Sequence, residues 1–375
     1  SIILMVGAVV VVFMHNIPYK WFQVFPVFLL PLSVVLLGLV MMMERINGAA
    51  RWMTFMGIQF QPSEVAKMAV IIVTAFILSK GQDEDGASPK AFKRIMIITG
   101  VVCLLIAPEN LSTAALLFGV VFLMMFIGRV AMKKLLILFG GLAGVAIVGV
   151  AFLVLTKNSD LPFLHRFDTW RARIEKFTDD TEVPAAKFDI DKDAQIAHAR
   201  IAVATSNVVG RGPGNSVQRD FLSQAFSDFI FAIIVEELGL IGGAFVVFLY
   251  VCLLIRVGRI AKKCDRTFPA FLIIGIALLL VSQAVFNMMV AVGLAPVTGQ
   301  PLPLISKGGT STLINCAYIG MILSVSRYTA KLEEIKEHDA QIPMQVEAAV
   351  EEGYSEIQTA AEPTAKVLNS DAEFE

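Results

Sequence analysis

Long runs of apolar residues dominate the sequence, and several approach the length that an α-helix needs to cross a lipid bilayer, about 20 residues. Of the 375 residues, 56% are hydrophobic and 17% are charged, and the mean hydropathy is +0.72. A soluble domain carries about a quarter charged residues, and a membrane β-barrel shows short alternating segments instead. The sequence therefore predicts an all-α polytopic membrane protein.

Nine apolar segments are candidate membrane spans. They comprise residues 2–14, 25–43, 63–79, 93–107, 111–128, 135–156, 228–256, 269–292 and 311–329. Lys and Arg gather in loops 80–94, 129–134 and 257–268, which the positive-inside rule places in the cytoplasm. The intervening loops then face the extracytoplasmic side, including a long loop at 157–227 in which amphipathic helices are predicted near 163–177 and 194–206. The C-terminus is predicted to be cytoplasmic.

The segment from residue 331 to 375 is an acidic tail with three Lys and twelve Asp or Glu residues. It contains little aromatic or branched apolar material, a composition typical of disorder. We therefore predict two parts, a transmembrane domain at 1–330 and a disordered, solubilising cytoplasmic tail at 331–375.

An acidic residue opens the seventh span, in the run Ser227-Asp228-Phe229. Ionisable groups at membrane depth are costly and are read as functional by default, so Asp228 is a candidate for proton transfer on a lipid-linked substrate. The alternative is that Ser227 or Asp228 caps the helix, since an acid suits the positive helix N-terminus. The two roles are compatible, because a capping carboxylate can also act as a base.

Two further acids, Glu236 and Glu237, lie deeper in the same span. On a straight helix they are about 12 to 13 Å from Asp228 along the axis, so neither forms a carboxylate pair with it. This spacing argues against a two-acid hydrolase site within the segment. We predict that Glu236 and Glu237 are structural and bond to neighbouring helices.

Two other segments carry polar groups that suit an anionic substrate. Glu64 and Lys67 lie three residues apart at the start of the third span and can meet on one helix face. A structural ion pair and a diphosphate contact are both open for them. In the last predicted outer loop, residues 293–310, Lys307 precedes Gly308 and Gly309 at a helix start, which suits an anion site, although a tight turn is the alternative.

Four motifs occur in the same order as in a known protein family. They are Asn47-Gly48-Ala49-Ala50-Arg51-Trp52, Gln61-Pro62-Ser63-Glu64, Ser227-Asp228-Phe229-Ile230-Phe231 with Glu236-Glu237-Leu238-Gly239, and the loop from Pro296 to Ser311. Together they resemble the SEDS family (shape, elongation, division and sporulation), which includes FtsW and RodA, over residues 1–330. The turn Gly212-Pro213-Gly214-Asn215-Ser216, followed by Gln218, is more similar to the division branch represented by FtsW.

The resemblance implies ten spans with both termini in the cytoplasm, so we expect that the family's first helix is missing from this nine-span sequence. It implies peptidoglycan glycosyl transfer from lipid II, during cell division or elongation, at the outer face of the bacterial cytoplasmic membrane. Asp228 would be the general base and undecaprenyl pyrophosphate the leaving group. No tightly bound cofactor is implied, although the family suggests a divalent cation, Mg or Mn.

The implied partners are the nascent glycan strand, a single-span class B penicillin-binding transpeptidase and other divisome or elongasome proteins, with no nucleic acid. Two arginines of the predicted outer loops, Arg51 and Arg173, add positive charge that suits a phosphate group. With the motif residues, the expected substrate contacts are Arg51, Glu64, Lys67, Arg173, Gln300, Ser306, Lys307, Gly308 and Gly309. A lipid II flippase and a non-catalytic divisome scaffold are the alternative functions. A flippase predicts polar residues along the whole path across the bilayer, whereas an enzyme predicts them at the outer face.

The sequence departs from the family pattern at three places. The usual Leu-Pro-Glu before the Asp228 motif is Leu222-Ser223-Gln224, the usual Pro-Asp-Leu-Gly is Pro108-Glu109-Asn110-Leu111-Ser112, and Lys307 stands where a Tyr is common. Asp228 is retained, so the implied activity is not excluded. Rearranged substrate contacts are the expected consequence of the departures.

Overall fold

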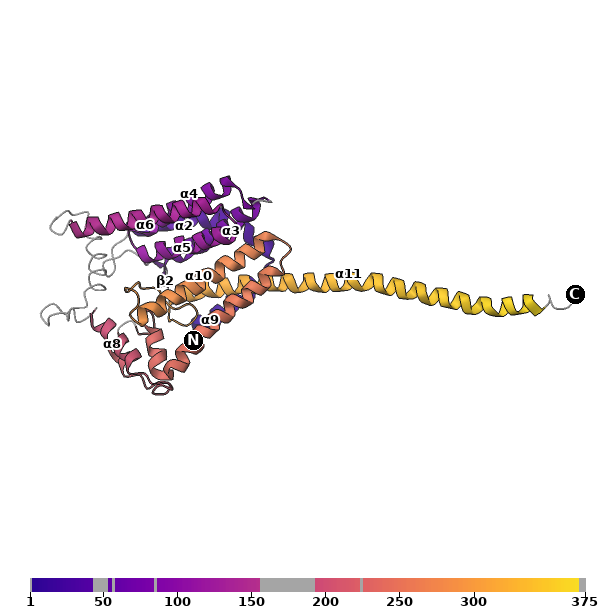
Figure 1. Cartoon of the computed structure of the whole chain (residues 1–375). Helices are drawn as coiled ribbons and strands as arrows, with labels where there is room; N and C mark the ends of the chain where they lie inside the picture. The colour runs from indigo at the N-terminus through magenta and orange to yellow at the C-terminus, as the bar shows by residue number, and fades with distance from the viewer. Residues whose placement is uncertain are drawn as a thin grey trace. The chain divides into compact units, whose positions relative to one another are not determined.

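The computed structural model describes residues 2–42, 53–55, 58–83, 86–155, 193–222 and 225–370, and most of its helices are labelled in Figure 1. Every predicted span coincides with a helix, and the bounds agree within six residues except at the end of the last helix. These helices are α1 (Ile2–Asn16), α2 (Phe25–Met42), α3 (Pro62–Lys80), α4 (Pro89–Ile106), α5 (Leu111–Ile127), α6 (Met132–Leu155), α9 (Ile230–Lys262), α10 (Thr267–Ala291) and α11 (Gly309–Ser370).

Five of the described helices are long and apolar enough to cross a membrane. They are α2, α3, α9, α10 and the Gly309–Asp339 part of α11, while α1 and α5 are apolar but shorter. This result agrees with a polytopic helical membrane protein.

Shorter elements connect the helices. A helix predicted near 194–206 is present as α8 (Asp193–Ala204), and two 3-10 helices, η1 (Tyr19–Gln23) and η4 (Gln218–Phe221), lie in the connections. The described strands form two small antiparallel hairpins, β1 (Met53–Phe55) with β2 (Ile58–Phe60), and β3 (Gln82–Asp83) with β4 (Gly86–Ala87). Since these hairpins lie in loops, the all-α character of the domain is unchanged.

The chain divides into two compact units, Ser1–Val325 and Ser326–Glu375. The helix α11 continues to Ser370, across most of the segment 331–375 that was predicted to be a disordered tail. The tail is rich in Ala and Glu, which have high helix propensities. A shortage of apolar side chains prevents such a segment from building a core, but it does not prevent a helix.

The helices α3 and α10 form the centre of the first unit. α3 packs against α2, α4, α5 and α10, and α10 also packs against α5 and α9. Because α3 is buried on nearly all sides, its polar residues Ser63, Glu64, Lys67 and Thr74 are also buried. Buried polar groups need partners inside the protein, so α3 requires polar groups on the helices beside it.

The helix α9 is broken at Gly239, whose φ of 72° and ψ of −170° are not helical. In an unbroken helix, the N–H groups of Leu240 and Ile241 would donate to carbonyls four residues earlier. Here they donate instead to Asn207 O at 3.2 Å and to Val208 O at 3.3 Å. The segment that follows α8 thus supplies carbonyl acceptors for these two N–H groups.

The same segment also satisfies the two carbonyls that the break leaves without their helical donors. Arg211 N–H donates to Glu236 O at 3.1 Å, and Gly212 N–H donates to Glu237 O at 2.8 Å. These four backbone groups at the break are therefore paired, as buried backbone groups must be. At the kink, α9 is therefore joined to residues 207–212 by backbone hydrogen bonds.

Candidate functional site

Asp228 lies in a turn formed by residues 225–229, immediately before α9. The N-cap of α9 is Phe229, and no side chain caps the helix there. The capping role considered for Ser227 or Asp228 is therefore wrong, because the helix begins two residues later than the apolar run suggests. The Ser227 hydroxyl donates to Asp228 Oδ1 at 2.9 Å, and Asp228 is half-buried.

Three consecutive carbonyls of this turn are fixed by donors from outside α9. The carbonyls of residues 226, 227 and 228 accept, in that order, from Lys307 N–H at 2.7 Å, Ser306 Oγ at 2.6 Å and Asn287 Nδ2 at 2.8 Å. Two of these donors belong to the last outer loop and the third belongs to α10. The backbone position of Asp228 is therefore set by α10 and this loop together.

The last outer loop is itself anchored by side chains of the helices around it. Two amides one turn apart on α10 donate to its carbonyls, Gln283 to Pro301 O at 3.0 Å and Asn287 to Gln300 O at 2.8 Å. From α9, Tyr250 donates to the carbonyl of residue 303 at 2.5 Å. The loop is also bonded to α5, because Gln300 Nε2 donates to the Thr113 hydroxyl at 2.6 Å.

Sequence reasoning missed the two α10 amides, Gln283 and Asn287. The signal was present, since they are polar residues four apart in an apolar span, and polar side chains in membrane helices commonly join segments by hydrogen bonds. What the sequence does not contain is the identity of their partners, which lie in the following loop and in the Asp228 turn.

The predicted anion-binding loop is placed at a helix start, as expected, with α11 beginning at Gly309. The Lys307 backbone N–H is bonded to Phe226 O and is not available to an anion, whereas the Lys307 side chain is exposed. Gln300 and Ser306 are 3% and 7% exposed, and their side chains bond within the protein. The loop therefore has a positioning role, with the Lys307 side chain on its surface.

Glu64 and Lys67 form a buried ion pair on α3. The carboxylate and ammonium groups are 2.7 Å apart, with the residues 2% and 0% exposed, and Lys67 Nζ also donates to Gln283 Oε1 at 3.0 Å. This geometry supports the structural ion pair rather than a direct diphosphate contact. Because Gln283 also holds Pro301, the pair supports the last outer loop indirectly.

Breaking this ion pair from one side is expected to destabilise the protein by about 3 kcal/mol, because the remaining buried charge loses its partner. Lys67→Met and Glu64→Gln should each lower the thermal unfolding temperature in detergent. The double variant should recover part of the loss, since it leaves no unpaired buried charge. Strictly additive losses in the double variant would contradict a direct pair.

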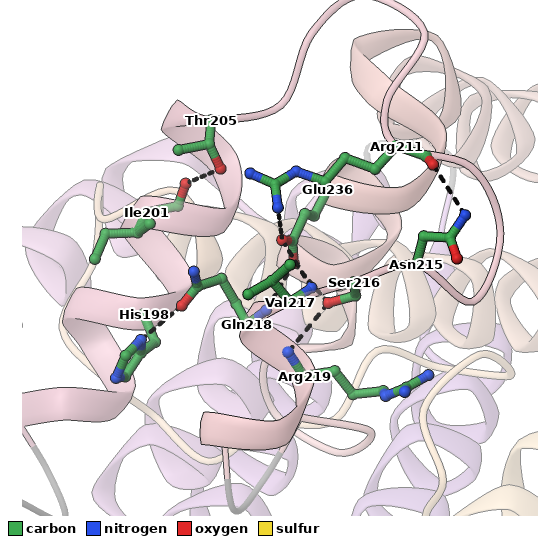
Figure 2. A network of polar contacts seen from close by, with 10 residues as sticks. All are labelled: His198, Ile201, Thr205, Arg211, Asn215, Ser216, Val217, Gln218, Arg219 and Glu236. Atoms are coloured by element: carbon green, nitrogen blue, oxygen red, sulfur yellow. Dashed lines mark hydrogen bonds and ion pairs between the residues drawn. The ribbon is translucent and has the colours of Figure 1, made fainter.

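Glu236 is fully buried and is the centre of a separate polar cluster (Figure 2). Its carboxylate accepts hydrogen bonds from Ser216 Oγ at 2.5 Å, Val217 N–H at 3.1 Å and Gln218 N–H at 3.3 Å, and Arg211 Nη1 lies 3.7 Å away. The cluster extends to α8, because Gln218 Oε1 is 2.6 Å from Nδ1 of His198.

The predicted structural role of Glu236 and Glu237 agrees with these contacts, but the predicted partners were wrong. Glu237 accepts from Gly214 N–H at 3.0 Å, so both acids bond to residues 211–218 and not to neighbouring helices. The physical reason is the break at Gly239, which opens the α9 backbone to this segment.

The described residues thus hold Asp228, Gln300, Ser306 and Lys307 in one connected region. Arg51 and Arg173 lie outside the described residues, as does the helix predicted near 163–177. Within the described part of the chain, no three His, Cys, Asp or Glu side chains gather into a group that could hold a metal ion.

A family model described as Cell cycle protein, covering FtsW, RodA and SpoVE, matches residues 1–331. The chain belongs to this family. The resemblance drawn from the four sequence motifs is thereby confirmed, and the match ends close to the predicted start of the acidic tail.

Relatives in this family are similar to most of the chain. A protein of Geobacter sp. (strain M18), named probable peptidoglycan glycosyltransferase FtsW, is 34% identical over 282 residues, covering 75% of this chain and 72% of the relative. A protein of the same name from Nitrosomonas europaea is 32% identical over 331 residues, covering 86% of this chain and 80% of the relative.

Solved structures have the same fold. A chain from a peptidoglycan synthase complex, described as coordinating polymerization and crosslinking, superposes with a TM-score of 0.68 at 25% identity and 88% coverage of both chains. The rod shape determining protein RodA of Thermus thermophilus superposes with a TM-score of 0.61 at 24% identity, covering 87% of this chain and 86% of RodA.

Proposed function

We propose that this member of the FtsW/RodA/SpoVE family is a peptidoglycan glycosyltransferase. It would polymerise lipid II into glycan strands at the outer face of the bacterial cytoplasmic membrane during division or elongation. The names of the relatives support the reaction class. The observation that carries the site is the Asp228 turn, whose three successive carbonyls are held by α10 and the last outer loop.

Asp228 is the proposed general base. Its carboxylate would take the proton from the 4-hydroxyl of the acceptor sugar, whose oxygen then forms the bond to the anomeric carbon of the donor glycan. The bond from that carbon to the diphosphate breaks, and undecaprenyl pyrophosphate leaves with the electron pair. A turn fixed on its main chain favours this role, because general-base catalysis requires the carboxylate and hydroxyl to be held in reacting geometry.

The departing diphosphate requires positive charge, which stabilises the negative charge that develops on it. The exposed side chain of Lys307 is the described candidate, and Arg51 and Arg173 are proposed from the sequence. Glu64, Lys67, Gln300 and Ser306 are assigned an indirect role, because their side chains are buried and bonded within the protein.

The described residues contain no group of three His, Cys, Asp or Glu side chains placed to hold a metal ion. We therefore assign no step to a protein-bound metal. A Mg or Mn ion carried by the substrate diphosphate is a separate proposal, consistent with the preference of Mg for phosphate oxygens. Adding a chelator to the polymerisation assay, and then restoring each ion, tests it.

A single-span class B penicillin-binding transpeptidase is the proposed partner. The similar chain in a peptidoglycan synthase complex that couples polymerization with crosslinking supports this proposal. The active site would lie on the extracytoplasmic side, and the C-terminus would lie in the cytoplasm.

The proposal is tested with purified protein and its transpeptidase partner, given labelled lipid II in detergent. We expect long glycan polymers that muramidase digests. Lipid movement across vesicle membranes without polymer would favour a flippase, and neither activity would favour a scaffold. The buried acids give a flippase little support, because Glu64 and Glu236 are buried and bonded to partners within the chain.

A further inference from the structure

Asn287 is 1% exposed, and its side chain joins two backbone segments. Its amide nitrogen donates to Asp228 O and to Gln300 O, each at 2.8 Å. Both partners are carbonyl oxygens, which only accept, so the atom facing them must be the amide nitrogen and the orientation of the side chain is fixed. Both hydrogens of the amide are therefore used to hold main chain.

Asn287 differs from the other groups that hold the Asp228 turn. Ser306 and Lys307 belong to the last outer loop, so their hydrogen bonds join the Asp228 turn to that loop and not to a helix. Asn287 belongs to α10, which packs in the centre of the first unit. Its side chain ties the carbonyl of Asp228 directly to this helix.

Gln283 provides an internal comparison, because it lies one turn before Asn287 on the same helix. Its amide nitrogen donates to Pro301 O, and its carbonyl accepts from Lys67. Gln283 therefore anchors the loop without bonding to the Asp228 turn. The bond to the turn is specific to Asn287 and is not a general property of α10 amides.

We propose that Asn287 is a positioning residue for Asp228, acting through the backbone of the turn and without contact with substrate. This inference rests on the proposed function, in which Asp228 is the general base. The two bonds fix the distance between the Asp228 turn and the Gln300 backbone, and so fix where the carboxylate stands relative to the loop. Displacing a catalytic group by about 1 Å costs on the order of 100-fold in rate.

The test compares Asn287→Leu, which is similar in size and lacks both donors, with a matched variant away from the site. Ser324 is 2% exposed, and its hydroxyl donates to Ile17 O at 2.5 Å, so Ser324→Ala also removes a buried bond to a carbonyl. We expect kcat for lipid II polymerisation to fall on the order of 100-fold in Asn287→Leu, with KM changed less than about threefold. Ser324→Ala should retain the wild-type rate.

A double variant separates positioning from general loss of structure. Adding Asn287→Leu to Asp228→Asn should cause no further loss of the residual rate, because the carboxylate that Asn287 positions is already absent. If Asn287→Leu does not fold, Asn287→Ser, which keeps one donor, replaces it and should show an intermediate kcat. A wild-type kcat in the variant that folds would overturn the inference.

The two levels of the proposal fail in different ways. If Asp228→Asn is inactive while Asn287→Leu and Asn287→Ser polymerise like Ser324→Ala, the positioning role is wrong and the proposed function stands. If Asp228→Asn polymerises like the wild-type protein, the base assignment is wrong and the role of Asn287 falls with it.

Discussion

Asp228→Asn is expected to lower the rate of lipid II polymerisation by at least about 100-fold, because a positioned general base contributes roughly 10² to 10⁴ in rate. The amide of Asn is nearly the same size as the carboxylate and can still accept a hydrogen bond from Ser227. The backbone bonds of the turn do not involve the replaced group. The variant should therefore fold normally and lose chemistry, with the binding of lipid II retained.

The matched control is Asp220→Asn, which removes the same charge from η4 at a side chain that is 75% exposed and paired with Arg219 at 3.3 Å. Glycan polymer is measured by gel electrophoresis after reaction with labelled lipid II, and folding is measured by thermal unfolding in detergent. We expect the Asp220 variant to polymerise at the wild-type rate. Equal polymer from Asp228→Asn and the wild-type protein would rule out Asp228 as the base.

The positions of the helices could be predicted closely because each lies on a long apolar run. A run of that kind is a local property, which the sequence shows directly. The break in α9 was not predictable in the same way. Gly239 lies inside a segment that the sequence predicts as one helix, and the break there depends on contacts with residues 207–212, which lie in the preceding loop.

The candidate site was predictable in its chemistry but not in its connections. An acid at the predicted membrane boundary marked Asp228, but the capping role could be excluded only from the helix start, which lies two residues further on. The last outer loop was predicted to bind an anion because it carries a cation and N–H groups at a helix start. In the structure, Lys307 N–H is used to hold the Asp228 turn, a tertiary contact that no local pattern contains.

Replacing Gly239 by Ala is expected to have the largest effect on folding. Its φ of 72° with ψ of −170° belongs to a region that is essentially restricted to glycine. A Cβ at this position would lie 2.3 Å from Val208 O and 2.5 Å from Gly210 N. Both atoms are backbone, so no side-chain rotation relieves the contact, and the paired groups of the break must separate.

We expect Gly239→Ala to destabilise the protein by at least about 4 kcal/mol, which is among the largest effects of single substitutions. The apparent melting temperature in detergent should fall by about 10 °C, or folded protein should not be recovered. The matched control is Gly258→Ala in the same helix, where an added Cβ meets nothing within 4 Å. Ala is the better helix former, so this control should gain up to about 1 kcal/mol. Equal stability of the two variants would show that the close crossing at Gly239 does not hold α9 in its broken form.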